Sequence, residues 1–135
     1  ILIKFIAETT RLLHDNGLNH RDYYACHYLL KLSQEQDAEN PDLAVNFVDH
    51  LYLIDLHRMQ IRCKTPTRYI IKDLSGLLFS IRNYNFTKTD YLRFVKYYSR
   101  DNGNNSNNSI SIDYRNYISF WKKVATKAKK LREKG

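Results

Sequence analysis

Residues 18–31 have the sequence LNHRDYYACHYLLK, and the fold of this segment decides the fold class expected for the whole chain. Asn19 is a residue type that caps helices, and the apolar side of such a helix would consist of Tyr24, Cys26 or His27, Leu30 and their neighbours. The pattern therefore predicts a helix from about residue 19 to residue 36.

Similar apolar spacing predicts five more helices around this one. The first ends near Gly17, the third begins after Asn40 and continues to about Ile61, and the fourth follows Pro66. A fifth is capped by Thr87 or Thr89, and a sixth, capped by Asp113, carries a basic end. The Asn-rich stretch at about 100–111 has little to bury and is expected to be a flexible loop. The expected fold class is all-α: a compact bundle of about six helices with a basic C-terminal helix, in one domain spanning residues 1–135.

The positive charge of the chain is concentrated at its C-terminal end. The formal net charge is +8, and residues 114–135 contain eight basic side chains and one acidic one, which gives +7 for that segment. Such a segment is expected to contact nucleic acid or an acidic partner, although a solvated helix end is an equally good interpretation. The candidate contact residues of this tail are Lys122, Lys123, Lys127, Lys129, Lys130 and Arg132.

Catalytic and metal-binding patterns are weak in this sequence. Asp49, His50, Asp55 and His57 lie close together, but their spacing matches no familiar metal motif, so a solvated acidic surface is favoured. Cys26 is expected to be a buried small apolar residue. We therefore expect no catalytic residue, no metal ligand and no cofactor.

The predicted second helix offers a better candidate for ligand binding. It begins with His20 and Arg21 and presents Lys31 about three turns later. Anions are favoured at helix N-termini, so a phosphate could bind there, although spacing alone favours ordinary surface charge.

Three segments in the first 75 residues together resemble a known family. Residues 18–31 resemble a segment in the C-terminal domain of the large primase protein, where Leu-x-His and a basic residue precede a helix ending Phe-Leu-Lys. Residues 41–48 resemble the next helix of that family, and residues 67–71 resemble its Thr-Arg-Tyr segment. The four cysteines that hold the family's iron–sulfur cluster are missing, since the chain has two. The chain thus resembles the PriX family, the small non-catalytic third subunit of archaeal (crenarchaeal) primase.

This resemblance implies an accessory subunit that supports RNA primer synthesis in DNA replication. It would bind the initiating nucleoside triphosphate and the single-stranded DNA template, while the catalytic and large primase subunits supply the metal and the chemistry. The residues implied in phosphate binding are His20, Arg21, Lys31, Arg68 and Lys72. The expected location is the cytoplasm near the nucleoid, with no membrane contact. A helical protein-interaction adaptor and a non-specific DNA-binding protein remain as alternatives.

Overall fold

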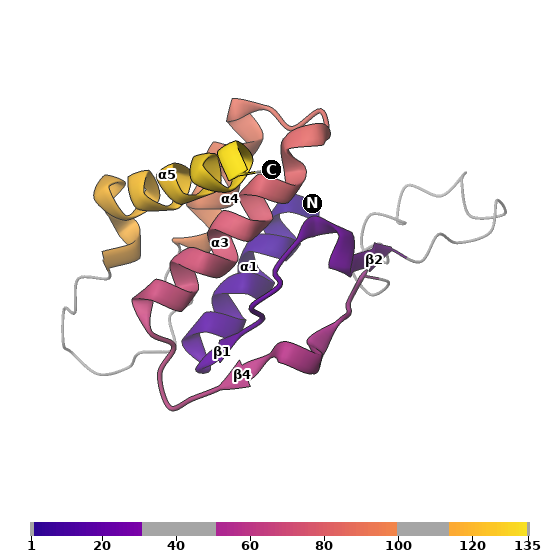
Figure 1. Ribbon diagram of the computed structural model, residues 1–135, viewed down its shortest axis with the longest axis vertical. Helices are drawn as coiled ribbons and strands as arrows, with labels where there is room; N and C mark the ends of the chain where they lie inside the picture. The colour runs from indigo at the N-terminus through magenta and orange to yellow at the C-terminus, as the bar shows by residue number, and fades with distance from the viewer. Residues whose placement is uncertain (1, 31–50, 100–113, 135) are drawn as a thin grey trace, which may run out of the picture.

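The computed structural model describes residues 2–30, 51–99 and 114–134, and its frame is a group of packed helices. The four α-helices within these ranges are α1 (Leu2–Asp15), α3 (Thr67–Ser80), α4 (Lys88–Tyr98) and α5 (Ile118–Lys134). Helix α3 packs against α5, and α1 packs against α4 (Figure 1). None of the helices in the described ranges is both long and apolar enough to cross a bilayer.

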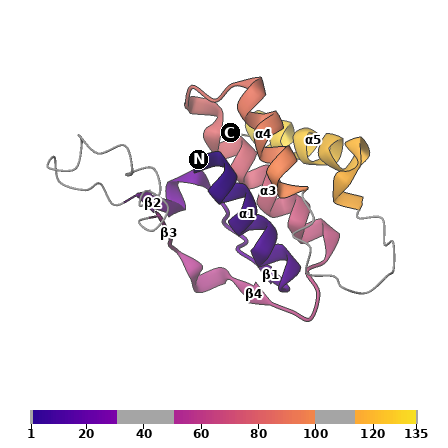
Figure 2. The same ribbon diagram turned by 180° about the vertical axis from the view of Figure 1, so that it is seen from behind.

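Two short antiparallel pairs of strands lie on one side of this frame, as the reverse view also shows (Figure 2). Strand β1 (Leu18–Asn19) pairs with β4 (Gln60–Ile61), and β2 (Tyr28–Leu30) pairs with β3 (Leu51–Leu53). The short 3-10 helices are η1 (Ala25–His27), η4 (Leu56–Arg58), η5 (Ile81–Asn83) and η6 (Tyr114–Asn116). The strand pairs bring the segment after α1 next to the segment that precedes α3.

The core lies where α3, α4 and α5 meet. Trp121 of α5 makes edge-on ring contacts with Phe94, Tyr98 and Phe120, with ring centroids 5.2–6.4 Å apart. Leu74 of α3 is 2% exposed and belongs to the same cluster. Burial of such rings and aliphatic side chains is the main force that holds the helices together.

The sequence predicted a helix at the position of each of α1, α3, α4 and α5, and these predictions are confirmed. Helix α1 ends just before Gly17, which has the expected left-handed conformation at φ 78°. Helix α4 begins after Thr87, whose side chain accepts a hydrogen bond from the Asp90 backbone while Asp90 binds back to the cap. Helix α3 follows Pro66 as predicted, and the basic last helix is present but begins at Ile118, after a 3-10 turn.

The predicted all-α bundle of about six helices is wrong, because residues 19–30 and 51–61 form short strands, loops and 3-10 turns and no α-helix. Arg21 has φ 75° and Asp55 has φ 63°, and neither conformation fits in a right-handed helix. The backbone of residues 28–30 instead pairs with that of residues 51–53. The remaining parts of these two predicted helices, the Asn-rich segment and Asp113 lie outside the described residues.

Candidate functional site

Two segments meet beside the strand pairs and form the candidate site. One is the loop from His20 to His27, and the other runs from Ile54 to Arg58. The Ile54 N–H donates to the His27 carbonyl at 2.9 Å, and the Ile54 carbonyl lies 3.0 Å from Nε2 of His20. These bonds fix the two segments against each other, and each segment presents one carboxylate.

The first carboxylate, Asp22, is held by a cation from the second segment. Nη1 of Arg58 donates to both oxygens of Asp22 at 2.9 Å. The Asp22 side chain is 19% exposed and that of Arg58 44%, so the pair lies at the edge of the site, where solvent can reach it. The contact fixes the direction of the Asp22 carboxylate and leaves it accessible.

The second carboxylate, Asp55, lies between two imidazole rings. Its Oδ2 is 3.3 Å from Nε2 of His27, and its Oδ1 contacts Nδ1 of His57. Nδ1 of His27 is in turn 2.7 Å from the backbone carbonyl of Asp22. Asp55 and the Asp22 segment are therefore linked through one histidine ring.

A buried carboxylate of α3 holds the start of the loop in place. Asp73 is 2% exposed and accepts hydrogen bonds from the backbone N–H groups of His20 at 2.8 Å and Arg21 at 3.0 Å. Its Oδ2 is also 3.2 Å from Nε2 of His14 on α1, while Nδ1 of that ring bonds the Tyr98 hydroxyl at 2.7 Å. Three helices thus support the backbone that carries Asp22.

Tyrosine hydroxyls attach the middle of the loop to α1. The Tyr23 hydroxyl is hydrogen-bonded to Thr10 of α1 at 2.6 Å and also to the hydroxyl of Tyr28. Burial raises the pKa of Tyr23 well above its ordinary value, and burial likewise raises the pKa of Tyr28. Both phenols therefore stay protonated and hydrogen-bonded at neutral pH.

The structure separates the residues predicted to bind phosphate. The His20 side chain is fully buried, with its ring 5.6 Å from that of His27, and Arg21 contributes its backbone N–H to Asp73. Arg68 is exposed and stacks on Tyr69 at 4.7 Å, and Lys72 is exposed farther along α3. Lys31 lies outside the described residues. The six predicted tail residues are all exposed on α5.

Metal ligands are sparse in the described ranges 2–30, 51–99 and 114–134, where no group of three His, Cys, Asp or Glu side chains could hold a metal ion. Asp55 with His27 supplies two donors. Magnesium in phosphoryl-transfer sites uses one or two carboxylates together with substrate phosphates and water, so this donor set fits a metal that arrives with a nucleotide.

Cys26 is exposed, so its predicted burial is wrong.

Comparison with solved structures identifies a kinase fold. The chain superposes on a structure described as WaaP in complex with acyl carrier protein with a TM-score of 0.67 and 32% sequence identity, which covers 96% of this chain and 48% of that one. The chain therefore has a mostly helical fold with small antiparallel strand pairs that matches part of the WaaP structure. This fold takes the place of the predicted all-α bundle.

The family model for lipopolysaccharide kinases (Kdo/WaaP) matches residues 1–98, and the chain belongs to this family. It is 43% identical over 98 residues to the lipopolysaccharide core heptose(I) kinase WaaP of Escherichia coli and 39% identical over 99 residues to that of Pseudomonas aeruginosa. Each match covers 73% of this chain and 34% of the relative. The chain thus spans about a third of the length of these curated relatives.

These findings overturn the interpretation of the chain as a PriX-like primase subunit. The family consists of lipopolysaccharide kinases, so the expected role in DNA replication, the non-catalytic assignment and the expected primase and DNA partners are wrong. The resemblance failed because it rested on short aromatic and aliphatic helices, whereas residues 18–30 form two short strands joined by a loop with a 3-10 turn.

The sequence did contain a signal for the site. Protein kinases carry a catalytic loop with the pattern H-R-D-x-x-x-x-N, in which the Asp accepts the proton of the substrate hydroxyl. Residues 20–27, HRDYYACH, follow this pattern up to the last position, where His27 replaces Asn. Asp22 and His27 were not predicted as site residues because the cations around them suggested phosphate binding instead.

Proposed function

We propose that this chain forms the phosphoryl-transfer part of a lipopolysaccharide core sugar kinase. The observation that carries the proposal is the pairing of Asp22, at the catalytic Asp position of the H-R-D pattern, with Asp55 on an adjacent segment. The two segments are joined by the backbone hydrogen bond from Ile54 to His27 and by the contact of the His20 ring with the Ile54 carbonyl. The heptose kinase relatives support a sugar hydroxyl of the lipopolysaccharide core as acceptor. The donor in this proposal is a nucleoside triphosphate, the usual phosphate donor of kinases.

In this proposal Asp22 orients the acceptor hydroxyl and takes up its proton as the hydroxyl oxygen bonds to the γ-phosphorus. The bond from that phosphorus to the oxygen bridging it to the β-phosphate breaks at the same time, and the nucleoside diphosphate leaves with the bonding electrons. Arg58 keeps both oxygens of Asp22 in a defined direction, and Asp73 keeps the backbone before Asp22 in place. Asp55 would hold the metal that accompanies the nucleotide, with His27 beside it. When bound, that metal neutralises the negative charge of the phosphates. This proposal departs from the expectation that the chain binds no metal, an expectation that nothing in the described structure tests.

Substitution of the two carboxylates tests this proposal in the natural protein at its full length. Asp22→Asn is expected to lower the rate of phosphate transfer to a heptose-containing acceptor by roughly 100-fold to 10,000-fold, the range for a general base. Asp55→Asn is expected to raise the metal concentration needed for half-maximal rate. Glu133→Gln, at the exposed end of α5, is the matched control and should transfer phosphate at the wild-type rate. Full activity of Asp22→Asn would refute the assignment.

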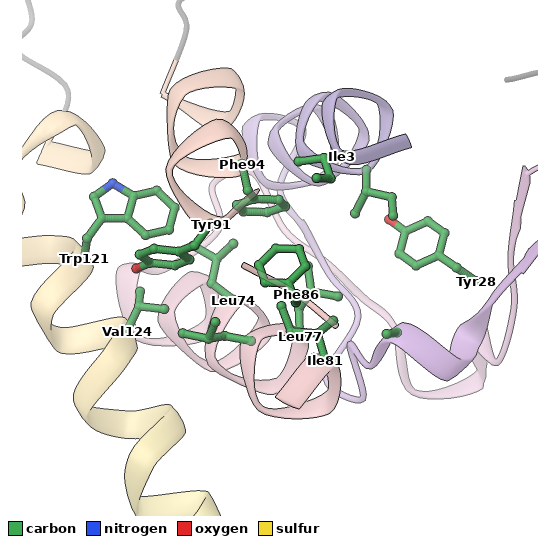
Figure 3. A pocket seen from close by; sticks show the side chains of 13 residues that line it. Ile3, Tyr28, Leu74, Leu77, Ile81, Phe86, Tyr91, Phe94, Trp121 and Val124 are labelled. Carbon is green, nitrogen blue, oxygen red and sulfur yellow. The ribbon is translucent and has the colours of Figure 1, made fainter. Parts of the chain in front are cut away.

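We also propose that an acyl carrier protein is a partner, because the solved WaaP structure holds one and this chain has an apolar cavity suited to the end of an acyl chain. The cavity, of about 80 Å³, lies where the helices meet β2 (Figure 3). Its lining includes Ile3, Tyr28, Leu77, Phe94 and Trp121. Its size fits only a few methylene groups, so most of an acyl chain would lie outside it.

Filling the cavity tests this second proposal. Ala25→Leu places a larger side chain into the lining without removing a core residue. The variant is expected to lose co-purification with acylated carrier protein and to keep its fold by circular dichroism. Unchanged recovery of the acylated form would contradict the assignment of the cavity.

A further inference from the structure

We propose that Arg62 and Arg68, which stack on the ring of Tyr69, bind an anionic group of the sugar acceptor, either a carboxylate or a phosphate monoester. These three residues are called the arginine–tyrosine cluster. The inference rests on the proposed kinase function and specifies its acceptor, which is a sugar substrate with a negative charge near the hydroxyl that receives the phosphoryl group.

The ring of Tyr69, in the first turn of α3, holds two guanidinium groups. The Cζ atom of Arg62 lies 4.4 Å from the ring centre, and that of Arg68 lies 4.7 Å from it. Nη2 of Arg68 also donates to the Tyr69 hydroxyl at 3.1 Å. The negative face of an aromatic ring attracts cations, so this one ring brings together two like charges that repel each other.

The guanidinium group of Arg62 is oriented by the protein itself. Its Nη1 donates to Oδ1 of Asn19 at 2.8 Å, and its Nη2 donates to Oε1 of Gln60 at 2.6 Å. The backbone N–H of Arg62 donates to the Gly17 carbonyl at 2.9 Å. Because a guanidinium group has five N–H donors, further donors remain available to a ligand after these two side-chain bonds.

The segment that carries the cluster is positively charged. Residues 56–72 contain no carboxylate, and Lys64 and Lys72 are both exposed. Within the described ranges, neither Arg62 nor Arg68 forms a salt bridge with a carboxylate. An anion bound by both arginines removes the repulsion between them, and guanidinium groups bind carboxylates and phosphates through paired N–H donors. The cluster therefore favours an anionic ligand.

The pairing of β1 with β4 places the cluster beside the loop that carries Asp22 (Figure 1). Asn19 of β1 is opposite Gln60 of β4, and it also accepts the hydrogen bond from Arg62. Asn19 precedes Asp22 by three residues, and a chain of that length spans at most about 11 Å. One acceptor is therefore able to present its hydroxyl to Asp22 and its anionic group to the cluster.

Removal of the exposed arginine tests the inference in the natural protein at its full length. In Arg68→Gln, the KM for the heptose-containing acceptor is expected to rise about tenfold while kcat stays unchanged, because a charge-assisted contact that binds the acceptor is lost. The KM for the nucleotide and the thermal unfolding temperature should not change. Arg93→Gln, at an exposed arginine of α4, is the matched control and should keep both KM values. Arg68→Lys keeps the charge without the planar donors, so its KM should lie between those of wild type and Arg68→Gln.

Modified acceptors identify the anionic group that the cluster binds. In one acceptor the sugar carboxylates are converted to amides, and in the other the phosphate monoesters are removed with a phosphatase. The wild type is expected to lose about tenfold in kcat/KM with the acceptor that lacks the bound group, whereas Arg68→Gln should lose nothing further with it. Equal losses in wild type and Arg68→Gln, or no loss in the wild type with either acceptor, overturn the inference.

Acceptor binding in the absence of nucleotide distinguishes this inference from the proposed function. Calorimetry should show an acceptor Kd about tenfold higher in Arg68→Gln, and the affinity of the wild type should fall more steeply with added salt. If the protein transfers phosphate but Arg68→Gln leaves the acceptor KM and Kd unchanged, or raises only the nucleotide KM, this inference alone is overturned. If acceptor binding depends on Arg68 but no phosphate is transferred, the kinase proposal is overturned and the anion site is supported.

Discussion

Replacement of Asp73 by alanine is expected to release the candidate catalytic loop. The carboxylate accepts two backbone N–H groups, from His20 and Arg21, and contacts Nε2 of His14, all within 2.8–3.2 Å. Hydrogen bonds to a charged group contribute about 1.5–3 kcal/mol each, and a buried donor left without a partner costs about 1–3 kcal/mol. Since these contacts share one acceptor and do not add fully, we expect Asp73→Ala to lower the free energy of unfolding by about 3–5 kcal/mol.

A graded series makes this prediction sharper. Asp73→Asn keeps one acceptor oxygen, so it should cost about half as much as the alanine variant. Lys72→Ala, at the exposed neighbouring position of α3, should change stability by less than about 0.5 kcal/mol. Urea unfolding measures the three values, and hydrogen exchange of the His20 and Arg21 amides measures the local effect. A loss below about 1 kcal/mol in Asp73→Ala, or unchanged exchange at these two amides, would refute the reasoning.

Three further predictions concern the turn after α1, the buried phenols and the Arg58 contact. Gly17→Ala should destabilise the protein by at least about 3 kcal/mol in thermal unfolding, since Gly17 has φ 78° and an added Cβ would lie 1.6 Å from the Arg62 carbonyl oxygen; a stable variant would contradict this geometry. Burial raises the pKa of Tyr23 and Tyr98, so the stabilisation that the neutral phenols contribute is complete below about pH 10 and is lost as the pH rises above that value. Urea titrations from pH 8 to 11 should show the free energy of unfolding falling at the upper end. An unchanged free energy of unfolding over this range would contradict the prediction. Arg58→Gln should lower phosphate transfer about tenfold and stability by less than about 1 kcal/mol, because the ion pair is partly exposed; an unchanged transfer rate in the kinase assay would show that Arg58 does not position Asp22.

The helices could be predicted because each is defined by its own sequence. Apolar residues recur at helical spacing along α1, α3, α4 and α5, and local stop and start signals such as Gly17 and Thr87 mark two of their ends. The strands could not be predicted in this way. They are two or three residues long, which is too short for an alternating pattern, and their partners lie far along the chain.

The candidate site was missed for an electrostatic reason. Net charge identifies only clusters of cations, and nearly all the excess positive charge lies at the end of α5. The candidate site instead contains single carboxylates, Asp22 and Asp55. They can be recognised as site residues only from the residues that lie around them in the structure. Asp55 was considered as a metal ligand, but its expected partners were on the same helix, whereas one of its neighbours in the structure, His27, lies on another segment.

The failed helix predictions and the candidate site have the same physical origin. Among the described residues, the two non-glycine positions with positive φ are Arg21, directly before Asp22, and Asp55 itself. Such conformations are strained for an arginine and persist only where surrounding contacts determine them. Asp73 supplies those contacts at Arg21, and the bonds of Ile54 to His20 and His27 supply them next to Asp55. The backbone therefore departs from the helix that the local sequence favours at the two points that carry the candidate-site carboxylates Asp22 and Asp55. Contacts from distant helices and strands stabilise that departure.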